Sequence, residues 1–141
     1  MVWVLLYTLT LAPLRSEADT LFRSQLSDAI ARGTDDERER IVLARLAWYE
    51  GSYSRRVASC AVKGDNGRSL GIFQVQPRSP LDRAEACGTL DAQVRVALRF
   101  MRRSVDVCRA NTGSAVLNLY TSGSCERGHA ASKDSWEQLL D

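Results

Sequence analysis

The pattern of hydrophobic and polar positions is helical along most of this chain. Over residues 90–108, apolar side chains recur at three- and four-residue spacing on one face, and arginines follow the opposite face. Similar spacing predicts helices over 20–31, from 34 to about 49, over 115–122 and over 132–140. We therefore expect a mainly α fold with at most a small β element.

Turn residues mark the ends of these helices and one irregular segment. Gly123 follows a predicted helix at a place where a left-handed glycine commonly ends one. The sequence Thr34-Asp-Asp-Glu37 is typical of a capping box, which predicts a helix start. Glycines and two prolines interrupt the periodicity over 51–80. We expect no continuous helix there, but a brief strand or one helical turn over 70–75.

Length and composition restrict the classes of function. A chain of 141 residues, 45% hydrophobic and 26% charged, is expected to fold as one globular domain. Its 19 basic and 17 acidic residues give a net charge of +2, which argues against a dedicated nucleic-acid binder. The single histidine, His129, excludes metal sites that need two imidazoles. We expect no metal and no cofactor.

The four cysteines indicate a disulfide framework. They contain no CxxC pair, the spacing that structural zinc and thioredoxin-like sites prefer. An even, scattered set favours two disulfides and an oxidising compartment, with four free thiols as the alternative. Three connectivities exist for four cysteines. We favour Cys60–Cys87 with Cys108–Cys125, because each bridge would tie neighbouring elements together.

The N-terminal segment has the features of an export signal. Residues 1–14 carry no charge and are too short to span a bilayer, which needs about 20 apolar residues. Ser16 and Ala18 supply small residues for a cut before Asp19. This predicts a signal or apolar segment over 1–18 and a secreted or periplasmic domain over 19–141, with no stable membrane span. The alternative is that the segment forms a buried first strand or helix.

Glu50 is the candidate for acid chemistry. It ends an apolar helix beside Trp48, Tyr49 and Tyr53, where desolvation would raise the pKa of its carboxyl. A carboxylic acid that keeps its proton near neutral pH is what a general acid for glycosidic cleavage requires. The alternative is a surface glutamate at a frayed helix end.

Three motifs in order resemble the lysozyme-like superfamily, specifically the soluble lytic transglycosylase domain and its goose-type lysozyme relatives. Residues 48–53, Trp-Tyr-Glu-Gly-Ser-Tyr, resemble the Glu-Ser-x-Phe sequence of that family at a helix end. Residues 69–75, Ser-Leu-Gly-Ile-Phe-Gln-Val, look like its Gly-Leu-Met-Gln signature. Residues 118–123, Asn-Leu-Tyr-Thr-Ser-Gly, are similar to Ala-Tyr-Asn-x-Gly. The resemblance covers about residues 35–130 and implies a lysozyme-like single domain.

The resemblance also implies roles for individual residues. Glu50 matches the acid that protonates the glycosidic oxygen between N-acetylmuramic acid and N-acetylglucosamine in peptidoglycan. Gln74 matches a glutamine lining the sugar cleft, and Tyr120 matches the tyrosine that orients the glutamate. Gly51 stands where the family usually has serine, and Ser52 is the candidate replacement. The expected activity is that of a monomeric lytic transglycosylase that leaves anhydro-muramic ends on peptidoglycan glycan strands.

Several alternatives stay open at this point. A hydrolytic muramidase would need a residue that places water, and Asp65 matches the Gly-Asp segment of goose-type lysozymes; it otherwise stabilises a turn. Gln76, where those enzymes often carry an acid, slightly favours the transglycosylase. Thr121 replaces the usual asparagine, and this change, with Gly51, motivates an inactive peptidoglycan-binding domain as a further alternative. A bacteriophage lysin would share the chemistry.

Overall fold

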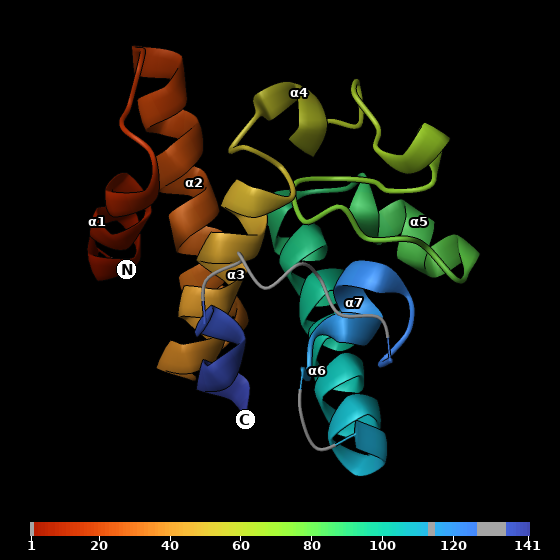
Figure 1. The fold of residues 1–141 in the computed structure, drawn as a ribbon. Helices are drawn as coiled ribbons and strands as arrows, with labels where there is room; N and C mark the ends of the chain where they lie inside the picture. The colour runs from red at the N-terminus through yellow and green to blue at the C-terminus, as the bar shows by residue number, and fades with distance from the viewer. Residues whose placement is uncertain (1, 113–114, 127–134) are drawn as a thin grey trace. The chain divides into compact units, whose positions relative to one another are not determined.

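The computed structural model describes residues 2–112, 115–126 and 135–141 (Figure 1). Two compact units divide the chain, residues 1–97 and residues 98–141. The boundary falls inside one long helix, so each unit is considered by itself.

The first unit opens with three helices, α1 (Val2–Leu11), α2 (Glu17–Gly33) and α3 (Glu37–Tyr49), which Figure 1 shows close together. α1 packs against both α2 and α3, and α2 packs against α3. Apolar residues at three- and four-residue spacing form the core between them. The side chains buried completely in these helices include Val4, Leu26, Ile30, Leu43 and Leu46.

Two arginines form hydrogen bonds that connect α1 to α2 and α3. The Arg23 guanidinium donates from Nη1 to the carbonyl oxygens of Thr8 and Ala12, at 3.2 and 2.8 Å. Thr8 lies in the last turn of α1, where its carbonyl oxygen also accepts from Ala12 N at 3.1 Å, and Ala12 is the residue that follows the helix. From α3, Arg45 Nε donates to the Tyr7 hydroxyl at 2.5 Å. The segment expected as an export signal therefore forms a packed helix here, and its cleavage stays a prediction.

The start of α2 bears on the expected cleavage point. Ser16 is the N-cap of α2, and its Oγ accepts a hydrogen bond from Asp19 N at 3.1 Å. A cut before Asp19 would therefore fall within the first turn of α2. No helix in the described part of the chain has the length and apolar character needed to cross a membrane.

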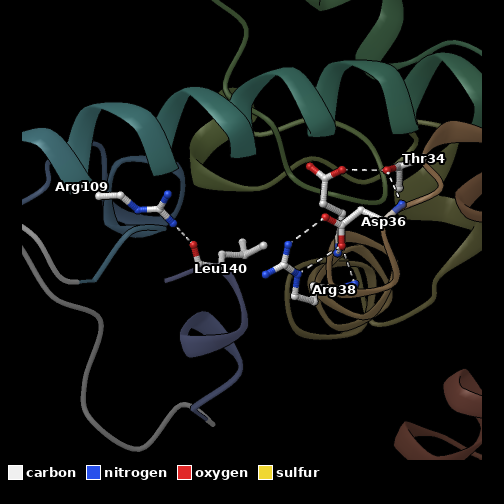
Figure 2. A network of polar contacts seen from close by, with 6 residues as sticks. Thr34, Asp36, Arg38, Arg109 and Leu140 are labelled. Atoms are coloured by element: carbon white, nitrogen blue, oxygen red, sulfur yellow. Dashed lines mark hydrogen bonds and ion pairs between the residues drawn. The ribbon is translucent and has the colours of Figure 1, made fainter.

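The cap of α3 differs from the expected one by two residues. Asp36 is the N-cap, and its Oδ1 accepts from the backbone N–H groups of Arg38 and Glu39. Thr34 instead accepts a bond from Asp36 N and donates to the Glu39 carboxylate at 2.7 Å (Figure 2). The aspartate carboxylate is the cap here because it accepts two backbone bonds and suits the positive end of the helix dipole.

Between α3 and Leu90, the first unit consists of short helices and irregular loops. It contains α4 (Arg55–Ala58), the 3₁₀ turn η1 (Asp65–Gly67) and α5 (Pro80–Ala86). Two isolated antiparallel bridges, Gly64 with Ser69 and Leu70 with Val75, are the β structure of the described residues. A small β element was expected, and the bridges are its form; the described chain has no strand.

The second unit contains the C-terminal part of α6 (Leu90–Thr112), α7 (Asn118–Ser122) and the 3₁₀ helix η2 (Ser135–Leu140). α6 extends four residues beyond its predicted end at 108. α7 starts three residues later than predicted and ends as predicted at Gly123, which is left-handed with φ 79°. Arg109 donates to the carbonyl oxygen of Leu140 within this unit (Figure 2).

Two disulfides stabilise the fold. Cys60 is bonded to Cys87 in the first unit, and Cys108 to Cys125 in the second. These are the pairs that the sequence favours. In the chain-entropy picture, loops of this size stabilise the folded state by about 3 kcal/mol each.

Candidate functional site

Glu50 lies at the C-terminal end of α3, as the sequence predicts. Its backbone N–H still bonds to Leu46 O at 2.8 Å, and the chain then leaves the helix through two left-handed residues, Ser52 and Tyr53 (φ 53° and 49°). The Glu50 side chain is partly buried, and its Oε1 is inaccessible to solvent.

A close backbone approach joins the end of α3 to the turn over residues 71–74. A Cβ added to Gly51 would lie 2.1 Å from the carbonyl oxygen of Ile72 and 2.8 Å from its Cδ1. Only a residue without a side chain fits at this distance. Glycine at position 51 therefore has a local steric cause, and it sets the residue after Glu50 directly against the turn over residues 71–74.

Gln74 belongs to this turn and is bound into it. Its backbone N–H and its Nε2 both donate to Gly71 O, at 3.1 and 2.9 Å. Its Oε1 faces Gly64 so closely that an added Cβ there would lie 2.1 Å away. The side chain expected to line a sugar cleft thus folds back over its own loop, and a cleft role would need it to turn outward.

Asp65 is exposed and hydrogen-bonded within the same loop. Its Oδ2 accepts from Ser69 Oγ at 2.5 Å and from Gln76 Nε2 at 3.1 Å. These two bonds, first from Ser69 and then from Gln76, hold the pKa of the Asp65 carboxyl below its usual range. Asp65 is therefore a turn-stabilising carboxylate, charged at neutral pH.

Tyr120 belongs to the second unit, whereas Glu50, Ser52, Asp65 and Gln74 belong to the first. The backbone N–H of Tyr120 donates to Ser104 Oγ at 3.1 Å, and that hydroxyl donates to the carbonyl oxygen of Val116 at 2.6 Å. The structure therefore explains how α7 is held on α6. The single histidine, His129, lies outside the described residues.

The neighbouring Thr121 also has a local partner. Its Oγ1 donates to Leu117 O at 3.0 Å, one turn earlier along the chain. The hydroxyl of Thr121 thus bonds back to the start of its own helix.

Gln93 is a positioning residue that the sequence analysis missed. It is buried on α6, where its Oε1 accepts from Ile72 N at 2.9 Å and its Nε2 donates to the carbonyl oxygens of Ala58 and Gly88. One amide therefore satisfies three backbone groups around the second motif. The available signal was a polar residue at helical spacing from Leu90 and Ala97 on the apolar face.

A cavity of about 1020 Å³ opens beside the end of α3. Ser52 lines it together with the rings of Trp48 and Tyr53, but Glu50, Gln74 and Asp65 do not. Four arginines lie in its wall, Arg15, Arg23, Arg55 and Arg56. These arginines come from separate segments, so no sequence motif connected them. Within the described residues, no cluster of His, Cys, Asp and Glu could hold a metal ion.

Comparisons of this chain with protein-family models, with curated proteins and with solved structures found no match. The lysozyme-like resemblance therefore rests on the three sequence motifs.

Proposed function

We propose that this protein cleaves peptidoglycan glycan strands as a lytic transglycosylase, with Glu50 as general acid and then base. The observation that supports the proposal most is the placement of Glu50. It lies at the end of a helix with a buried apolar face, and one of its carboxyl oxygens is out of solvent. The next residue, Gly51, lies directly against the turn that carries the second motif. An acid-catalysed glycosidase needs such a desolvated carboxyl beside a rigid loop.

The proposed reaction uses no water. The Glu50 carboxylic acid donates its proton to the glycosidic oxygen, and the bond from that oxygen to the muramic acid C1 breaks with the electron pair going to the oxygen. The Glu50 carboxylate then accepts a proton from a hydroxyl of the same muramic acid, whose oxygen bonds to C1. The products are a free N-acetylglucosamine hydroxyl and an anhydro-muramic end, and Glu50 regains its proton.

Other residues have supporting roles in this proposal. Gln74 would contact the sugar after turning outward, and Ser52 would take the place of the serine of the resembled family. Tyr120 keeps the supporting role that the resemblance implies for it. The enzyme would act as a monomer outside the cytoplasm, and its two disulfides support an oxidising location.

The experiment is release of soluble fragments from purified peptidoglycan, followed by turbidity. Glu50→Gln keeps the shape of the side chain and removes the proton donor, so we expect at least a hundredfold loss of rate. Glu37→Gln is the matched control, because it makes the same change at the exposed N-terminal end of the same helix. Equal activity in the native protein and in Glu50→Gln would refute the assignment of Glu50.

Mass spectrometry of the fragments distinguishes the alternatives. Anhydro-muramic ends support the transglycosylase. Reducing ends would refute it and favour a muramidase, in which Asp65 would place the water. Binding to peptidoglycan without release of fragments by either protein would favour an inactive glycan-binding domain.

A further inference from the structure

The arginine-lined cavity of the first unit has a charge imbalance that the proposed function does not use. Four arginines line the cavity, one each from positions 15 and 23 and two from α4, against one carboxylate, Asp19. Among the described residues, none of these arginines forms an ion pair with a carboxylate. Like charges gathered around a cavity repel one another, so this wall favours a negative occupant.

Arg23 is the buried member of this group. Only 4% of its surface is exposed. Its guanidinium stacks over the Tyr53 ring, with Cζ 4.0 Å from the ring centroid, and Nη1 bonds to Thr8 O and Ala12 O. These contacts fix the plane of the guanidinium, a preorganised state for binding an oxyanion.

The Arg23 Nε is buried and has no hydrogen-bond partner. An unsatisfied buried donor on a charged group costs more than one on a neutral group, and it is relieved by an acceptor. A purely structural arginine that caps α1 would explain the bonds of Nη1, but it leaves Nε unexplained. Nε and Nη2 form the edge of a guanidinium that commonly holds two oxygens of a carboxylate or phosphate. Because Nε is out of contact with solvent, an oxyanion must displace the atoms that cover this edge in order to bind there.

We propose that this cavity binds a small ligand through an oxyanion group, a carboxylate or a phosphate, with Arg23 as the fixed donor and Arg55 and Arg56 as exposed cations that strengthen attraction. The ring of Trp48, which lines the same cavity, offers an apolar surface for the rest of the ligand. Glu50 is not part of the cavity wall, although Ser52 from the following loop is. Because Arg15 and residues 11–13 also line the cavity, the site belongs to the chain that keeps residues 1–18.

The experiment titrates the full chain with two probes, citrate and inorganic pyrophosphate, at low ionic strength by calorimetry. In parallel, the arginine Nε–H signals are followed by ¹⁵N NMR. We expect saturable binding of at least one probe and a shift of the Arg23 Nε–H signal. Citrate alone would identify the class as carboxylate, and pyrophosphate alone would identify it as phosphate.

Variants separate this site from general attraction to a basic protein. Arg23→Gln also removes the bonds to α1, so the principal variant is Arg55→Gln with Arg56→Gln, both exposed. We expect that double variant to bind about fivefold or more weakly. The matched control is a second double variant, Arg78→Gln with Arg83→Gln, elsewhere in the first unit. It should leave the affinity unchanged. Either of two results would overturn the proposal: dissociation constants weaker than about 10 mM for both probes, or equal weakening by the control pair.

Discussion

Replacing Gly51 by alanine perturbs the contact on which the site geometry depends. The new Cβ would lie 2.1 Å from the carbonyl oxygen of Ile72, whereas ordinary contacts begin at 3.4 Å. The helix end and the turn would therefore have to separate by about 1.3 Å, and the obstructing atom is backbone rather than a mobile side-chain tip. The change tests whether the end of α3 really abuts the second motif.

The expected cost follows from two opposing terms. Forcing a methyl group into a packed site costs typically about 1–3 kcal/mol. Replacing glycine by alanine also stabilises by about 0.4–1 kcal/mol, because the unfolded chain loses freedom. Since the clash involves rigid backbone, we expect the upper end of the first range and a net destabilisation of about 2 kcal/mol. For a chain of this length that lowers the melting temperature by roughly 5–8 °C.

The assay is urea unfolding with the disulfides intact, compared with thermal unfolding. Gly67→Ala is the matched control: its φ of 87° strains an alanine, but its added Cβ meets nothing within 4 Å. Its cost should be near 1 kcal/mol and purely conformational. If Gly51→Ala proves as stable as the native protein, the close approach of Gly51 to Ile72 is refuted, and the placement of Glu50 against the second motif with it.

Three further predictions concern stability. Gln93→Leu leaves the buried Ile72 N–H without its acceptor, so urea unfolding should show a loss of about 2–4 kcal/mol. Burial raises the pKa of Tyr53, so the native protein should lose stability as the pH rises above about 10, where the unfolded tyrosine ionises; Tyr53→Phe should flatten this decline, and an unchanged slope would contradict the assignment. Hydrogen bonds lower the pKa of Asp65, so its contribution to folding stability is present above about pH 4 and is lost as the pH falls through the folded pKa. Asp65→Asn should cost no more than about 1 kcal/mol at pH 7 and should weaken the loss of stability at acid pH. A stronger loss of stability at acid pH in this variant would contradict the assignment.

Helices with a regular apolar stripe could be predicted from the sequence. α6 was located within four residues because its pattern persists over several turns. α5 was missed because it is seven residues long, too short for periodicity to emerge. Its start was nevertheless encoded, since Ser79 caps it and Pro80 occupies its first turn, a favoured place for proline. Our expectation for residues 51–80 treated proline only as a residue that interrupts helices.

The candidate site could be predicted only where its residues lie next to one another in the sequence. Glu50 could be found because a helix end and its flanking aromatics are contiguous in sequence. The support of the second motif could not, because Gln93 reaches Ile72 across 21 positions. Nor could the bond of the cavity residue Arg23 to Thr8, which lies 15 positions away. Such contacts depend on how helices pack, which local pattern does not encode.

The contacts of Asp65 bear on whether water takes part in the reaction. A hydrolytic mechanism needs a second group free to hold a water molecule beside the sugar. Here Oδ2 of Asp65 already accepts two hydrogen bonds, from Ser69 and from Gln76. An acid in place of Gln76 would repel Asp65 and raise its pKa, whereas the amide keeps it ionised and tied to the turn. A carboxylate engaged in this way contributes to the loop through Oδ2. In the proposed reaction the proton transfers would therefore fall to Glu50, and we expect anhydro ends.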